Sequence, residues 1–204
     1  MMLFSIVGAL WVGHQQPKKP NVLHLDSCTL PCWIGIIPEK STVAEAKNSV
    51  RLVYGGSPQY RIAEHISWVA VYDNNSGALV ITVVFLVPKL TISNDDIVEG
   101  IELRTNMLIG DAMIALPIPD AITLWGQGGG TFPALLYTRS GVMITVDTPI
   151  VDLTTCKRIT TDEHVQSIAI YPNRLKQISE AKSQKWITTG YCYNWPFRLS
   201  EALD

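Results

Sequence analysis

Residues 65–87 read HISWVAVYDNNSGALVITVVFLV, and this stretch decides the fold class. Two runs of β-branched and aromatic residues, which favour strands, flank the turn cluster NNSG at residues 74–77. Asparagine and glycine readily adopt the positive φ values of a tight turn. The stretch therefore predicts an antiparallel β-hairpin. Its first strand has an aromatic face that includes Trp68 and Tyr72, and its second strand is continuously apolar.

A helical pattern precedes this hairpin, and the same order recurs later in the chain. Residues 42–53 have apolar residues at helical spacing, and Thr42 and Glu45 form the sequence signature of a capping box at their start. A second, short helix is expected at residues 108–116. Strand-forming runs follow it, including a second hairpin at residues 132–146.

The chain has 204 residues, of which 47% are hydrophobic. This is enough for one core, so we expect a single α+β domain over residues 22–204. Within it, the repeated order predicts two helix-plus-antiparallel-sheet halves, about residues 22–100 and 101–204, in a layered arrangement. The formal net charge is −2 and the charges are interspersed, so nucleic-acid binding is not expected.

Residues 1–21 are expected to be the remnant of a signal peptide or membrane anchor, followed by a linker. The apolar run from Met2 to Val12 has the length of a signal-peptide core and is too short to span a bilayer. It lacks a positive segment before it and a clean cleavage site after it, so a buried N-terminal strand is the alternative. The export interpretation places the protein outside the cytoplasm, secreted or membrane-anchored at the cell surface.

The four cysteines are Cys28, Cys32, Cys156 and Cys192. Disulfides are the default in an exported chain, and pairing each cysteine with its nearer neighbour in the sequence closes the shorter loops. In a cytosolic protein the same residues would be free thiols, or Cys28 and Cys32 would bind zinc together with His24. Pro31 and the extended flanking residues disfavour the helix that would bring these three zinc ligands together.

Residues 28–46, CTLPCWIGIIPEKSTVAEA, resemble a motif of the form C-x-x-P-C-W-x-G-I-x-P-G-x-T-x-x-E-A. This motif recurs in uncharacterised exported bacterial proteins and lipoproteins, and Glu39 stands where it has glycine. More distantly, a helix followed by a hairpin is similar to the helix-plus-sheet repeat of the β-lactamase-inhibitor protein and of outer-membrane-assembly lipoproteins. Those proteins are binding modules, so the resemblance implies an interaction role rather than an enzymatic one.

Three motifs have possible chemistry, and none is specific. The polar cluster at residues 24–27 lacks the nucleophile elbow of a hydrolase. The glycine run at residues 126–130 lacks the lysine and helix entry of a phosphate loop, so a hairpin loop is expected. The acidic residues between 95 and 102 lack the spacing of a calcium loop and are expected to lie on the surface. We therefore expect no catalytic residues, no cofactor and no metal site.

Tryptophans beside proline or glycine near loop ends can fill a core or anchor a partner. A core position is favoured here, and Trp33 is the candidate partner contact if one of them is exposed. Together these patterns predict an extracytoplasmic, non-enzymatic binding module whose partner is another protein or an envelope component. A small hydrolase or thiol enzyme, and a purely structural envelope domain, are the alternatives.

Overall fold

The structure is a computed structural model that describes residues 23–25, 27–89, 91–116, 118–127, 130–147, 159, 162–173, 175 and 184–185. The predicted signal or anchor segment, residues 1–21, lies outside this part of the chain, as do Cys156 and Cys192. No helix in the described part is long and apolar enough to cross a membrane.

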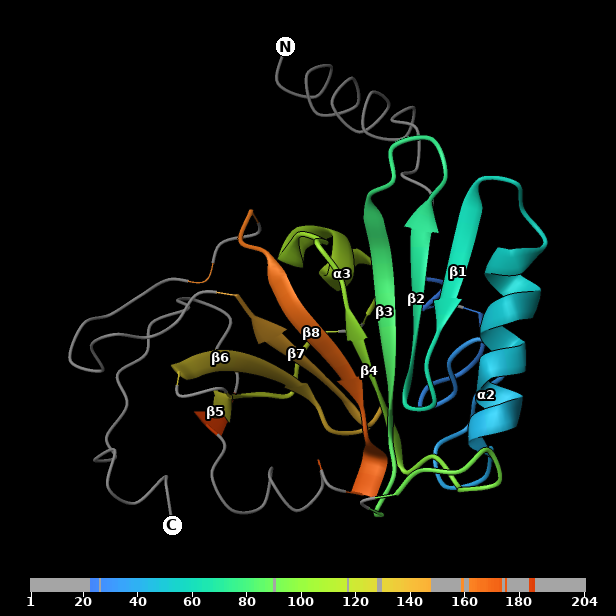
Figure 1. Ribbon diagram of the computed structural model, residues 1–204. Coiled ribbons are helices and arrows are strands. Elements are labelled where there is room, and N and C mark those ends of the chain that lie inside the picture. Colours follow the sequence, from blue (N-terminus) through green and yellow to red (C-terminus); the bar gives the residue numbers. More distant parts are fainter. Residues whose placement is uncertain are drawn as a thin grey trace.

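The described part is mostly β, with one antiparallel sheet and short helices (Figure 1). The strands are β1 (Tyr60–Glu64), β2 (Trp68–Asp73), β3 (Leu79–Leu86), β4 (Gly100–Arg104), β5 (Ala121–Gln127), β6 (Gly130–Tyr137), β7 (Val142–Val146), β8 (Val165–Ile170) and the two-residue β9 (Gln184–Lys185). They lie in the order β1-β2-β3-β4-β8-β7-β6-β5-β9. Both predicted hairpins are confirmed, as β2–β3 and β6–β7.

The expectation of two helix-plus-sheet halves is wrong. The meanders β1–β4 and β5–β7 are joined into one continuous sheet because β8 pairs with β4 on one side and β7 on the other. Ile170 lies opposite both Ile101 and Val142, so the backbone ladder runs unbroken through the centre. The α+β class therefore holds only in part, because the sheet dominates the described part. The two expected halves are joined by backbone hydrogen bonds within one sheet and are not separate packed units.

The helix predicted at residues 42–53 is α2 (Val43–Val50), which continues as the π-helical turn η1 (Arg51–Gly55). Thr42 and Glu45 form the expected capping box, with each side chain accepting a hydrogen bond from the backbone N–H of the other. This satisfies two N–H groups that the helix itself leaves unpaired. The second predicted helix is α3 (Ile109–Ala115).

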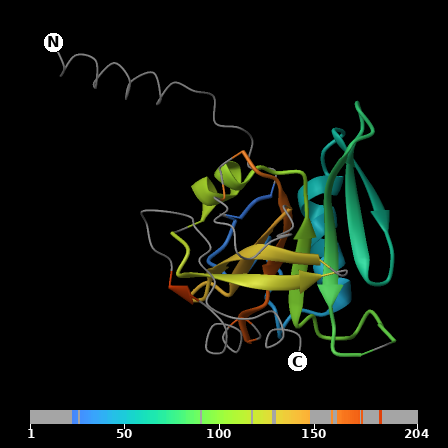
Figure 2. The same cartoon turned by 90° about the vertical axis from the view of Figure 1, so that its left-hand side faces the viewer.

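One face of the sheet, here called the inner face, carries the main core. In β2, Val69 and Val71 are buried, and in β3, Ile81, Val83 and Phe85 are buried, so side chains of alternate residues point to this face. The apolar stripe of α2 and the segment of residues 23–41 belong to the same buried cluster. Figure 2 shows both lying on this side of the sheet.

The opposite side, here called the outer face, differs between the two ends of the sheet. Register runs across it from Trp68 through Val84 and Glu102 to Ala169, because each of these residues lies opposite the next. At the β5–β8 end, five outer-face residues are buried and form a second cluster with Leu175. We call them the covered face, and they are Ala121, Ala134, Leu136, Met143 and Ala169.

Candidate functional site

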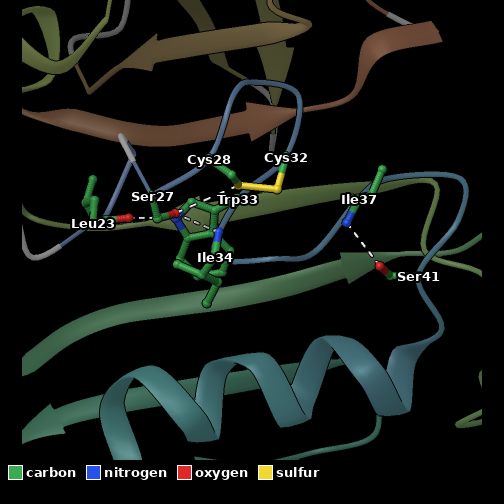
Figure 3. Close-up of a disulfide and its surroundings, with 8 residues drawn as sticks. All are labelled: Leu23, Ser27, Cys28, Cys32, Trp33, Ile34, Ile37 and Ser41. Carbon is green, nitrogen blue, oxygen red and sulfur yellow. Dashed lines mark hydrogen bonds between the residues drawn. A yellow bond between two sulfur atoms is a disulfide. The ribbon is translucent and has the colours of Figure 1, made fainter.

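The cysteine-rich segment forms a small closed loop against the inner face (Figure 3). Cys28 and Cys32 are joined by a disulfide with a Cα–Cα distance of 5.7 Å, as predicted for this pair. The zinc and free-thiol alternatives for these two cysteines are therefore wrong. The described residues contain no cluster of three or more side chains that could hold a metal ion. The Cys156–Cys192 pairing stays a prediction, because both residues lie outside the described part.

Trp33 directly follows this disulfide and is fully buried, so it is not the exposed partner contact considered from the sequence. Its indole Nε1 donates a hydrogen bond of 2.6 Å to the Leu23 carbonyl oxygen (Figure 3). Its backbone pairs with Ile36 across the tight turn formed by Ile34 and Gly35, both of which have positive φ. A buried tryptophan needs a hydrogen-bond partner for its N–H, and for Trp33 that partner is the Leu23 carbonyl.

Glu39 has a φ of 68°, in the left-handed region that favours glycine. This is the position at which the resembled motif has glycine. The Glu39 backbone N–H donates to the Val98 carbonyl at 2.7 Å, and its carboxylate accepts from the Asn173 side chain. These bonds hold a non-glycine residue in a conformation that costs free energy.

The structure also places the glycine run and most of the acidic residues between 95 and 102. The glycine run lies at the β5–β6 hairpin, where Gln127 pairs with Gly130, as the hairpin interpretation requires. Three of the acidic residues between 95 and 102 have separate partners. Asp96 pairs with Lys89, Glu99 accepts a hydrogen bond from the Tyr171 hydroxyl, and Glu102 pairs with Arg104.

An aromatic and aliphatic surface remains on the outer face of β2 and β3. We call it the aromatic face, and it comprises Trp68, Tyr72, Val84 and Leu86, all of them partly exposed. These side chains alternate with the buried residues of the inner face and so point away from the core. Arg61 of β1 lies beside this surface, with its guanidinium 5.2 Å from the centre of the Tyr72 ring.

A pocket of about 600 Å³ opens at the edge of the same end of the sheet. One wall is a stripe of α2 and η1 with Ala44, Lys47 and Arg51, which lie one turn apart. The remaining lining residues are Glu64, His65, Ile66 and Asn94. The pocket thus lies between α2, the end of β1 and the loop that precedes β4.

Two contacts define the electrostatics of this pocket. Arg51 donates both Nε and Nη2 to the two carboxylate oxygens of Glu64, in a bidentate ion pair. The hydrogen bond from Arg51 lowers the pKa of Glu64 below its ordinary value, and the positive charge of Lys47 acts in the same direction. Glu64 is therefore ionised at neutral pH.

His65 connects the pocket with the aromatic face. Its ring lines the pocket and stacks on Trp68, with the ring centroids 5.6 Å apart and the planes 17° from parallel. Its Nδ1 lies 3.2 Å from the Ser67 Oγ within the same turn. The lining includes neither a cysteine nor a second histidine, so the pocket offers charge and shape rather than a nucleophile with its base.

The strand that bears the aromatic face was predicted from the sequence, whereas the pocket was not. Lys47 directly follows Ala46 and so lies at the edge of the apolar stripe of α2. A lysine at this position of a buried helix face is the signal that could have indicated the pocket. The strands β1 and β4 were also missed, although Ile101 and Leu103 alternate with Glu102 and Arg104 in the pattern of a half-buried strand.

No family model, no curated protein and no solved structure matches this chain. The resemblance carried by residues 28–46 therefore stays a prediction.

Proposed function

We propose that this chain is an extracytoplasmic, non-enzymatic module that binds another protein through the aromatic face. The observation that carries the proposal is the difference along one side of the sheet. The covered-face residues on β5–β8 are buried, whereas Trp68, Tyr72, Val84 and Leu86 are left partly exposed around the buried Ala70. Apolar side chains that gather on a sheet and stay exposed mark interaction surfaces, and no described segment covers these four.

The composition of this surface favours a polypeptide partner. Tryptophan, tyrosine and arginine are the residues that contribute most binding free energy in protein interfaces. Here Trp68 and Tyr72 lie on the same face of β2, on either side of Ala70, and Arg61 stacks on Tyr72. No carboxylate among the described residues forms an ion pair with Arg61. A partner with apolar side chains and an acidic group beside them would complement both features.

Two further observations support the compartment and the absence of catalysis. The Cys28–Cys32 disulfide is typical of oxidising compartments outside the cytoplasm. The same bond removes these two thiols from the thiol-enzyme alternative. His65 has a serine hydroxyl within reach, but Ser67 lies two residues away in the same turn, an arrangement typical of a local turn bond.

Photo-crosslinking followed by direct affinity measurement tests the proposal. A benzoylphenylalanine residue at position 72 is expected to crosslink to a specific protein, which mass spectrometry identifies. Calorimetry with that purified protein then compares the original chain with the Trp68→Ala/Tyr72→Ala variant. We expect at least about a tenfold loss of affinity, since interface aromatics contribute roughly 2 kcal/mol or more.

Leu52→Ala is the matched control, because Leu52 is 74% exposed but lies on η1, away from the aromatic face. It should bind as the original chain does. Equal affinity of the aromatic-face variant and the control would refute the proposal. A complete absence of specific crosslinks would favour the purely structural envelope domain instead.

A further inference from the structure

We infer that the pocket between α2 and β1 binds a carboxylate group, supplied by an acidic side chain of the polypeptide that the aromatic face binds. This inference rests on the proposed function and names the chemistry of the partner. Four features of the pocket carry it: a buried lysine, a balanced ion pair beside it, an apolar rim, and continuity with the aromatic face.

Lys47 provides the positive charge. Only 8% of the residue is exposed, yet its side chain lines the pocket. Its ammonium group has three donors, and the hydrogen bond found for it runs to the Asn94 Oδ1 at 3.4 Å, which is long for a charged donor. Taking an ammonium group out of water is costly unless it is paired. A ligand oxygen in the pocket would supply the pairing that Asn94 supplies only weakly.

The neighbouring charges leave one positive charge to be matched. Arg51 and Glu64 neutralise each other through their bidentate contact, so among the lysine, arginine and glutamate side chains of the lining the Lys47 charge is the one left over. A single carboxylate matches this charge. A phosphate dianion would overcompensate it and would be repelled by the ionised Glu64.

The rim explains why an amino-acid side chain suits the pocket better than a free anion. Ala44 and Ile66 give apolar contacts at the opening, and Ile66 is 37% exposed. His65 lines the pocket and also stacks on Trp68 of the aromatic face. A polypeptide on the aromatic face could therefore extend an acidic side chain past His65 toward Lys47.

NMR titration with a small probe tests the pocket without needing the partner. The probe is N-acetyl-glutamate with its α-carboxyl blocked as a methylamide, so that only the side-chain carboxylate is charged. We expect saturable shifts of the backbone amide signals of His65 and Ile66. The glutamine analogue of the probe should give none, and inorganic phosphate should bind more weakly.

Three variants make the test specific. Lys47→Met keeps the buried aliphatic stem and removes the charge, so probe affinity should fall about tenfold, the value of one charge-assisted hydrogen bond. Glu64→Gln should raise the affinity several-fold, because it removes the negative charge from the lining. Lys40→Met is the matched control, since Lys40 is exposed and does not line the pocket. Circular dichroism and unfolding midpoints confirm that each variant is folded.

The inference is overturned if Lys47→Met binds the probe as the original chain does, or if the glutamine analogue or phosphate binds equally well. The crosslinked partner separates this failure from that of the proposed function. Partner affinity that depends on Trp68 and Tyr72 but not on Lys47 would leave the proposed function standing and refute the carboxylate pocket. Lys47-dependent binding of the probe, with no partner at the aromatic face, would refute the proposed function instead.

Discussion

The outer side of the sheet is completed differently at its two ends. Over β5–β8, small and apolar residues such as Ala134 and Ala169 are buried together with Leu175. Over β2 and β3, larger residues such as Trp68 and Tyr72 are left partly exposed. Both ends share the same inner core and one continuous ladder. The comparison teaches that the two ends differ in cover: aliphatic residues are buried on the outer face at one end, and aromatic side chains are left partly exposed among the described residues at the other.

The largest expected effect comes from placing the same charge on each face. Ala134→Lys buries an ammonium group at a position with no exposure, and we expect a loss of at least about 3 kcal/mol in the free energy of unfolding. Val84→Lys places the same group on the aromatic face, opposite Glu102, and should change it by no more than about 1 kcal/mol. Urea unfolding monitored by circular dichroism measures both. Similar losses for the two variants would show that the faces do not differ in cover.

Removing the disulfide should lower stability without changing that difference. The Cys28→Ser/Cys32→Ser variant loses a short covalent loop, and constraint of the unfolded chain predicts a loss of about 2 kcal/mol. The loop packs on the inner core that both ends share, so its effect should add to those of Ala134→Lys and Val84→Lys. Urea unfolding of the combined variants checks this. A loss confined to one combination would mean that the two ends unfold separately.

A gain in stability is expected at Glu39, which lies in the segment of residues 23–41 that packs on the inner face of the sheet. Glu39 has a φ of 68°, which glycine adopts without steric cost, so Glu39→Gly should stabilise the fold by about 1 kcal/mol. Thermal unfolding measures the change in midpoint. Lys40→Gly is the neighbouring control, and it should lower the midpoint because its φ is not positive. A lower midpoint for Glu39→Gly would show that the Asn173 contact outweighs the backbone strain.

The smallest effect concerns pH, and we expect it at the end of the sheet that bears the aromatic face. The ion pairs found among the described residues, Arg51–Glu64, Lys89–Asp96 and Arg104–Glu102, all lie on α2, η1 and β1–β4 or their loops. Hydrogen bonds from Arg51 and from Lys89 lower the pKa values of Glu64 and Asp96 in the folded state. Their contribution is therefore fully present above the unfolded carboxyl pKa of about 4 and is lost as pH falls through the lower folded values.

Hydrogen exchange at neutral pH and near pH 3 can locate this loss. Amides of β1 and α2 should lose protection on acidification more than amides of β6 and β7. In Glu64→Gln the part of the loss that belongs to the Arg51 contact should disappear. A uniform loss of protection across the sheet would contradict the assignment of these charges to one end.

Local patterns in the sequence determined the elements themselves. The capping box of Thr42 and Glu45, the NNSG turn at residues 74–77, and the Cys28–Cys32 bridge were all predicted correctly. Each depends on residues within a few positions of one another, where backbone preference and short-range hydrogen bonds decide the outcome. The aromatic alternation of Trp68 and Tyr72 was also visible from the sequence alone.

Tertiary structure decided what those elements face. Only the packing of α2 and residues 23–41 on Val69 and Val71 made the aromatic side of β2 the outer one. Only the insertion of β8 between β4 and β7 merged the two expected halves into one sheet. Tertiary packing also buried Trp33 and placed Lys47 and His65 in the lining of one pocket. Burial and pocket formation depend on contacts between segments far apart in the chain, and periodicity within a single segment does not specify its partner.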